Sequence, residues 1–284
     1  MLHHPKLTHH SLSFHKSSIN VVEHESLGPD RGTLIFLHGR FSTSDIWNPL
    51  VRSFQKEFNC VFVEFPGFGR SFTLDDFFPT LLENAKFVSD FIKLRQGPVI
   101  LVGQDSGAAI AQLVAVHEKL ESEKTAGLVF INPLSLGEEL PMRTWYFVNF
   151  GLRLLVNKAV REAMGISADD RENILKSWNT RASRKPLIHA IRALHESWPG
   201  YYERMFWKKA MTTIKVPVLL LAGMRDPFDP SEHAFDLVRR IPETYFFLSE
   251  ECGHWPSVEN PDWVISKMRD FVEKVAPRTL RKKA

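Results

Sequence analysis

Six short apolar runs, each ended by a Gly or Pro turn, constrain the fold of this 284-residue chain more than any other feature. Within each run the apolar residues are continuous rather than alternating, which is typical of strands buried on both faces of a parallel sheet. Helical stretches between the runs are consistent with right-handed crossovers. The runs are TLIFLHG (33–39), CVFVEFPG (60–67), PVILVGQD (98–105), GLVFINP (127–133), VPVLLLAG (216–223) and TYFFLSEECG (244–253). The pattern predicts an α/β fold with a mostly parallel, doubly wound sheet, and two alternating stretches (10–15 and 19–24) predict an antiparallel hairpin at one edge.

The regular spacing of these runs is interrupted once, between residues 133 and 216. The interval is rich in Trp, Phe, Tyr, Arg and Lys, and its pattern is helical. We therefore expect a helical cap over 134–213, inserted between two parts of one core, 1–133 and 214–284. Ligands of parallel sheets bind at the carboxyl ends of the strands, so a cap at that edge would cover the site.

Three of the apolar runs lead into a polar residue that could be presented at this edge of the sheet. Asp105, Asp226 and His254 follow in that order along the chain. The order of nucleophile, acid and histidine is the one found in α/β-hydrolases. Asp229 competes with Asp226, but Asp226 is nearer the strand end and Asp229 could cap the next helix.

Several motifs together resemble the α/β-hydrolase superfamily over roughly residues 30–273, the cap excluded. FLHGR (36–40) is similar to the oxyanion segment of that family, and EFPGFGRS (64–71) to its Gly-rich turn. VGQDSG (102–107) stands where the nucleophile elbow belongs. GMRDPFDP and CGHWPSVENP resemble the segments that carry the acid and the histidine. The resemblance implies the α/β-hydrolase fold, and a structural rather than catalytic role for His38.

The elbow could be centred on Asp105 or on Ser106, and the flanking residues decide between them. A sharp strand-to-helix turn needs small residues two positions before and two after the nucleophile. The Asp105 frame places Gly103 and Gly107 there, whereas the Ser106 frame places the larger Gln104 at the first position. The sequence therefore predicts Asp105 as the nucleophile.

An aspartate nucleophile changes the chemistry that the site can perform. A carboxylate can attack an sp³ carbon that carries a leaving group, which leaves an alkyl ester on the enzyme. His254, oriented by Asp226, would then activate water for attack on that ester. The backbone N–H groups of Arg40 and Ser106 are the expected donors to the resulting oxyanion.

Within the superfamily the pattern is most similar to the aspartate-nucleophile branch, which includes epoxide hydrolases and haloalkane dehalogenases. Dehalogenases of that branch typically have Trp after the nucleophile and often Asn after the His-Gly pair, where this chain has Ser106 and Arg40. Fluoroacetate-type dehalogenases usually have Arg after the nucleophile, which is also missing. The sequence therefore favours epoxide hydrolysis over dehalogenation.

Epoxide opening needs an acid, and in this branch a pair of cap tyrosines usually supplies it. Tyr146, Tyr201 and Tyr202 are the candidates here, because a neutral phenol can donate to the developing alkoxide. One departure affects the oxyanion loop, where Phe41 replaces the family's Pro.

Three alternatives remain open at this point: a haloalkane or haloacid dehalogenase, a serine-type esterase or lactonase using Ser106, and a non-catalytic small-molecule binder. Arg40 could be solvated or could attract an anionic substrate. We expect no cofactor and no metal, and as partners a small apolar organic substrate and water. The net charge of +3 argues against nucleic acid, and no run reaches membrane-spanning length. Only Cys60 and Cys252 are cysteines, which with the lack of an apolar leader indicates a cytoplasmic protein.

Overall fold

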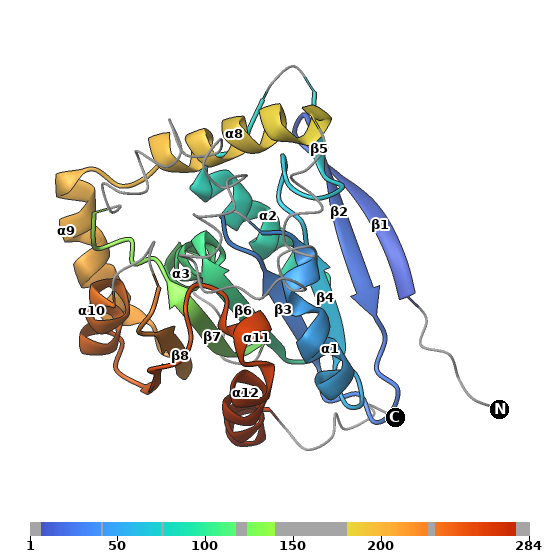
Figure 1. The fold of residues 1–284 in the computed structure, drawn as a ribbon, viewed down its shortest axis with the longest axis vertical. Helices are drawn as coiled ribbons and strands as arrows, with labels where there is room; N and C mark the ends of the chain where they lie inside the picture. Colours follow the sequence, from blue (N-terminus) through green and yellow to red (C-terminus); the bar gives the residue numbers. More distant parts are fainter. Residues whose placement is uncertain are drawn as a thin grey trace.

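The structure, a computed structural model, describes residues 7–40, 42–74, 77–117, 124–139, 181–226 and 231–276. Its centre is a mostly parallel sheet. The strands are β1 Leu7–Phe14, β2 Ser17–His24, β3 Thr33–Leu37, β4 Asn59–Val63, β5 Phe72–Thr73, β6 Val99–Asp105, β7 Thr125–Pro133, β8 Val218–Gly223 and β9 Thr244–Ser249. Their order in the sheet is β1-β2-β4-β3-β6-β7-β8-β9, and β5 pairs with β2 (Figure 1). The predicted α/β-hydrolase fold is confirmed.

The first two strands form the antiparallel hairpin, and β3, β4, β6, β7, β8 and β9 are parallel to their neighbours within that group. Every residue of β3, β6 and β8 is buried, as the continuous apolar runs predict. The last strand differs, because it lies at the edge of the sheet. In β9, Phe247 and Leu248 are each 37% exposed, so this run is not buried on both faces.

Helices pack against the sheet in two groups. The helices are α1 Asn48–Phe54, α2 Leu81–Lys93, α3 Ser106–His117, α8 Arg181–Glu196, α9 Tyr201–Ala210, α10 Glu232–Arg240, α11 Pro256–Glu259 and α12 Pro261–Val275. One group joins α1 with α11 and α12, and the other joins α2 with α3 (Figure 1). The α2 helix begins with a capping box, in which the Thr80 hydroxyl and the Glu83 carboxylate each accept a backbone N–H of the other residue. Two 3₁₀ helices, η1 Ser44–Trp47 and η3 Met211–Thr213, complete the described elements.

The helices α8 and α9 belong to the interval between β7 and β8, where the sequence predicts an inserted helical region. Figure 1 shows α8 lying across one end of the molecule. This end is the carboxyl edge of the sheet, because the Ser197 hydroxyl just after α8 accepts the Leu81 N–H and Gly67, in the loop after β4, lies against Ala190. Residues 140–180 lie outside the described part of the chain, so the cap limits of 134 and 213 stay a prediction.

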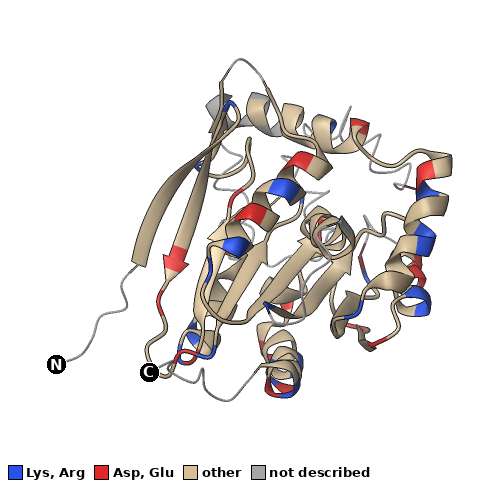
Figure 2. Ribbon diagram, turned by 180° about the vertical axis from the view of Figure 1, so that it is seen from behind, with Lys and Arg blue, Asp and Glu red and all other residues tan. Residues whose placement is uncertain are grey.

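The surface carries charges of both signs. Figure 2 shows basic and acidic residues interspersed along the outer helices, in agreement with the small net charge. Among the described residues, no helix is both long and apolar enough to cross a bilayer. The same residues contain no group of three or more His, Cys, Asp or Glu side chains placed to hold a metal ion.

Candidate active site

Asp105 occupies the sharp turn at which β6 ends and α3 begins. Its backbone has a φ of +53°, a left-handed conformation that is costly for a residue with a side chain. A Cβ on Gly103 would lie 2.6 Å from the Gly107 carbonyl oxygen, and a Cβ on Gly107 would overlap the Leu37 carbonyl oxygen. The two glycines are needed because the backbone segments approach each other closely. The turn is therefore centred on Asp105, as the sequence predicts.

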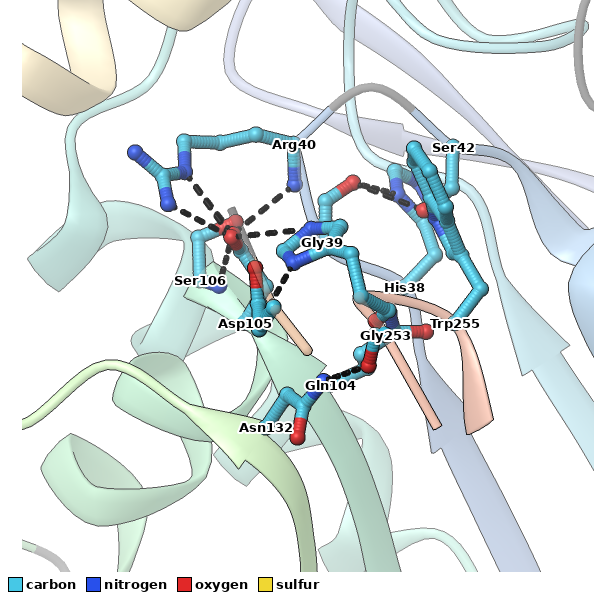
Figure 3. Close-up of polar contacts among 12 residues, drawn as sticks. His38, Gly39, Arg40, Ser42, Gln104, Asp105, Ser106, Asn132, Gly253 and Trp255 are labelled. Atoms are coloured by element: carbon cyan, nitrogen blue, oxygen red, sulfur yellow. Dashed lines mark hydrogen bonds and ion pairs between the residues drawn. The ribbon is translucent and has the colours of Figure 1, made fainter. Parts of the chain in front are cut away.

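Among the described residues, the two oxygens of the Asp105 carboxylate differ in their backbone contacts (Figure 3). Oδ1 accepts the backbone N–H of Arg40 at 3.1 Å and that of Ser106, the first residue of α3. Both N–H groups are those expected to form the oxyanion hole. The positive end of the α3 dipole adds to the stabilisation of negative charge at this point.

Arg40 also contacts the same carboxylate through its side chain (Figure 3). Its Nε donates to Asp105 Oδ1 at 2.9 Å, and its Nη2 donates to Oδ2 at 2.6 Å. The Arg40 and Asp105 side chains are only 3% and 0% exposed. A two-pronged guanidinium–carboxylate pair of this kind is among the stronger interactions in proteins. The possibility of a solvated Arg40 side chain is therefore wrong, because the guanidinium is buried against Asp105.

His254 lies between the two predicted acids. Its Nδ1 is 2.8 Å from Asp226 Oδ2, and its Nε2 is 3.5 Å from Asp105 Oδ2. Because a carboxylate can only accept, we assign the Nδ1 proton to the bond with Asp226, which leaves Nε2 facing Asp105. All three side chains are at most 2% exposed. The structure thus brings Asp105, His254 and Asp226 together, with a hydrogen bond between His254 and Asp226 and a 3.5 Å contact between His254 and Asp105.

The loop that carries His254 is held by two buried side-chain amides. Gln104 Nε2 donates to the His254 carbonyl oxygen at 2.6 Å, and Asn132 Nδ2 donates to the Gly253 carbonyl oxygen at 2.6 Å. Asn132 Oδ1 in turn accepts the Gly223 N–H at the end of β8. Asn132 has a φ of +40°, so it too is a strained residue at a strand end. Sequence reasoning assigned no role to these two amides.

A partly buried carboxylate, that of Glu259, holds the same loop. Glu259 accepts the Trp255 N–H at 2.8 Å and the Gly253 N–H. Burial raises the pKa of Glu259 above its ordinary value, although the two N–H bonds act in the opposite direction. The sequence contained one usable signal, since an acid four residues after Trp255 can reach back across one helical turn.

His38 lies beneath the oxyanion segment and bonds to backbone through both ring nitrogens. Its Nδ1 is 2.9 Å from the Gly39 carbonyl oxygen, and its Nε2 accepts the Phe65 N–H at 3.0 Å. Burial lowers the pKa of His38, so the neutral ring is favoured. This geometry agrees with a structural role.

Of the tyrosines predicted as cap acids, the structure describes Tyr201 and Tyr202, and neither contacts Asp105, Asp226 or His254. Tyr201 and Tyr202 lie on α9 with side chains that are 66% and 85% exposed, and their rings contact each other. Tyr146 lies outside the described residues, as does Phe41 of the oxyanion loop. The prediction that a tyrosine donates the proton for epoxide opening therefore has no support from the described residues.

Comparison with known proteins identifies the class. The model of the alpha/beta hydrolase family matches residues 34–267, and the chain belongs to that family. The 2-hydroxy-6-oxo-6-(2'-aminophenyl)hexa-2,4-dienoic acid hydrolase of Metapseudomonas resinovorans is 24% identical over 87% of this chain and 86% of its own. The pimeloyl-[acyl-carrier protein] methyl ester esterase of Legionella pneumophila (strain Corby) is 21% identical over 84% and 95%.

Solved structures give the same fold. A serine hydrolase involved in carbazole degradation superposes with a TM-score of 0.73 at 20% identity, covering 95% of this chain and 100% of its own. A laboratory-evolved variant of a potato epoxide hydrolase gives 0.70 at 16% identity, with coverage of 95% and 100%. The chain is thus an α/β-hydrolase, and these relatives give less support to epoxide hydrolysis than to ester or related hydrolysis.

Proposed function

We propose that the protein is a hydrolase in which Asp105, not a serine, forms the covalent intermediate. The observation that carries the proposal is the division of labour between the two oxygens of Asp105. Oδ1 lies against the backbone N–H groups of Arg40 and Ser106, whereas Oδ2 accepts Arg40 Nη2 and faces His254. This arrangement supports one oxygen as the attacking atom and the other as the future oxyanion.

The first step is a displacement at an sp³ carbon of the substrate. Asp105 Oδ2 forms a bond to that carbon, and the leaving group departs with the bonding electron pair. Asp105 becomes a neutral alkyl ester. Epoxides belong to the compounds that such a step can open, and so do other molecules with a leaving group on an sp³ carbon.

The second step is hydrolysis of that ester. His254 takes a proton at Nε2 from a water molecule, whose oxygen attacks Cγ of Asp105, and negative charge develops on Oδ1. The intermediate collapses with loss of Oδ2 in the product alcohol, which accepts the proton from His254. Asp226 holds the imidazole through Nδ1 and stabilises its transient positive charge. The carboxylate that remains on Asp105 carries one oxygen from water.

Isotope labelling and trapping test this sequence directly. We expect turnover in H₂¹⁸O to place ¹⁸O in the peptide that contains Asp105, as seen by mass spectrometry after digestion. His254→Gln should accumulate an adduct on Asp105 when incubated with a panel of epoxides, organohalides and activated esters. Asp105→Ala should lose activity by a factor on the order of 10⁴–10⁶. A turnover that leaves Asp105 unlabelled would contradict the proposal.

Ester hydrolysis through the Ser106 hydroxyl is the second candidate, and the names of the relatives favour it. The relatives include a methyl ester esterase and a serine hydrolase. Ser106→Ala separates the two candidates, since it removes the hydroxyl and keeps the N–H that contacts Asp105 Oδ1. Loss of all activity in Ser106→Ala, together with an acyl adduct on Ser106 in the wild type, would establish the serine mechanism. An Asp105 adduct with activity retained in Ser106→Ala would exclude it.

A further inference from the structure

A cavity of about 440 Å³ lies between the β1–β2 hairpin and the segment that contains η1. Its walls come from β1, β2, β4, η1 and the Gly-rich turn after β4, and none of Asp105, Asp226 and His254 lines it. Its volume falls within the range of about 300–1,000 Å³ that is typical of small-molecule sites. The cavity is therefore a candidate binding site that the proposed hydrolysis does not use.

Glu64 contributes a buried carboxylate to the wall of this cavity and is only 4% exposed. Its Oε1 accepts the Ser44 hydroxyl at 2.7 Å, and its Oε2 accepts Asn20 Nδ2 at 2.8 Å and the Arg70 backbone N–H at 2.9 Å. All three donors are neutral, and within the described ranges no cationic side chain forms an ion pair with Glu64. A buried charge is costly without an opposite charge, and Oε1 can accept a second donor. Glu64 therefore favours a ligand that is a cation.

The other polar groups of the wall also include acceptors. Asp45 of η1 adds a second carboxylate at an exposed position. Because the Asn20 amide nitrogen donates to Glu64, Asn20 Oδ1 is left as an acceptor. Burial lowers the pKa of His24, so its neutral ring can accept as well. The His24 ring packs edge-on against Phe62, at 5.5 Å between centroids, and the aromatic face of Phe62 can attract a cation.

Arg70 is the one guanidinium in the wall and opposes this preference. Its Nη1 lies 3.4 Å from His9 Nδ1, and the residue is exposed, so solvent screens its charge more than it screens that of Glu64. We propose that the cavity binds a small organic cation with a primary ammonium group. An ammonium group supplies a positive charge and three N–H donors, which match a wall of carboxylate, amide and imidazole acceptors.

Isothermal titration calorimetry of the full chain with butylammonium chloride tests this proposal. The neutral and anionic controls are 1-butanol and sodium butyrate, at constant ionic strength and at pH 8, above the ordinary pKa of histidine. We expect butylammonium to bind and the two controls not to bind. Glu64→Gln, which removes the buried charge and keeps the length of the side chain, should weaken binding about 10- to 100-fold, as loss of one hydrogen bond to a charged group does.

Substitutions at exposed positions test the proposal even if Glu64→Gln does not fold. Asp45→Asn should weaken butylammonium binding about 2- to 5-fold, because its carboxylate is screened by solvent. Arg70→Gln should strengthen binding by a similar factor, since it removes the opposing charge. Glu232→Gln, at an exposed acid on α10, is the matched control and should leave the affinity unchanged.

A further variant shows whether the cation binds at the candidate active site instead. Asp105→Asn should keep the wild-type affinity for butylammonium, and loss of affinity in this variant would overturn the proposal. Absence of binding, equal binding of 1-butanol, unchanged affinity in both Glu64→Gln and Asp45→Asn, or butyrate binding that depends on Arg70 would overturn it too. None of these measurements uses turnover, so their outcome is independent of the proposed hydrolysis.

Discussion

At the scale of single residues, Asp105 differs from a serine in the same place by carrying a charge and a second oxygen. This extra oxygen, Oδ1, accepts the backbone N–H groups of Arg40 and Ser106. An acyl-serine intermediate would use these donors only during the reaction. The charge is offset by Arg40, within hydrogen-bond distance of both oxygens. The strained backbone of Asp105 places these groups at the strand end, where a substrate can approach. The chemistry of the site therefore follows from one residue and its immediate neighbours.

Glu259 gives a residue-scale prediction about pH. Burial raises its pKa in the folded protein above the ordinary value of 4.5, so its contribution to stability is fully present below pH 4.5 and is lost as the pH rises through the folded pKa. In Glu259→Gln this dependence disappears. We expect the variant to match the wild type near pH 4.5, because a protonated carboxyl, like the amide, offers one acceptor oxygen to the two N–H groups. As the pH rises, the wild type should lose stability relative to the variant.

Urea denaturation at a series of pH values between 4.5 and 7 measures this difference. Glu251→Gln is the matched control, because Glu251 lies in the same loop but is exposed. The control should follow the wild type at every pH. Stability curves of Glu259→Gln and wild type that run parallel over the whole range would show that Glu259 is not the titrating group.

At the scale of secondary structure, the apolar runs were sufficient to predict most strands. The run at 98–105 became β6 (Val99–Asp105), because its side chains are buried on both faces and its period has no competing helical interpretation. The strand β5, Phe72–Thr73, was missed because two residues are too short to form a pattern. The run at 60–67 contains β4 up to Val63, and its Pro66 and Gly67 lie in the turn that follows, as the sequence predicts.

Residues of the candidate site could be predicted from the sequence only where they lie near a strand end. The proximity of Asp105, Asp226 and His254 could be predicted, because each lies at or shortly after a strand end. Gln104 and Asn132 could not, because their roles depend on bonds to a loop more than 100 residues away. The backbone of Arg40 was predicted beside the oxyanion, but the direction of its side chain depends on tertiary packing.

Asn132 gives the prediction at this scale, because its amide joins the ends of β7 and β8 to the His254 loop. Asn132→Ala removes both bonds and keeps a side chain at φ +40°, so we expect a loss of about 2–4 kcal/mol in the free energy of unfolding. Asn132→Gly removes the same bonds without the backbone strain and should lose less. Chemical denaturation of the two variants separates the bonds from the strain.

The kinetic effect of Asn132→Ala should fall on one step. In the proposed function, His254 acts in hydrolysis of the ester, whereas alkylation depends on Asp105. We expect dealkylation to slow more than alkylation, which quenched-flow mass spectrometry of intact protein resolves. Equal slowing of both steps would indicate a general loss of structure instead of a displaced histidine.

At the scale of the whole molecule, the carboxyl ends and the amino ends of the parallel strands carry different kinds of polar group. The carboxyl ends of the strands carry Asp105, Asp226 and His254, whose burial, together with the positive φ of Asp105, costs stability. At the amino edge, Arg31 before β3 donates to Glu57 before β4 and to Glu273 on α12. Its guanidinium thereby joins three segments that are far apart in the sequence. We infer that ion pairs at this edge offset part of the cost of the site.

Replacement of Arg31 tests this separation between stability and chemistry. The Arg31 side chain is 6% exposed, but Glu57 and Glu273 are 33% and 49% exposed, so solvent screens the pairs. We expect Arg31→Ala to lower the free energy of unfolding by about 1–3 kcal/mol. Each kcal/mol corresponds to roughly 2–4 °C in Tm for a chain of this size.

The rates of alkylation and dealkylation at 25 °C should equal those of the wild type, because Arg31 and Asp105 lie at opposite ends of the parallel strands. Arg52→Ala, at an exposed position on α1, should leave both Tm and rates unchanged. Slower chemistry in Arg31→Ala at temperatures where it is fully folded would show that the two edges are coupled through the sheet.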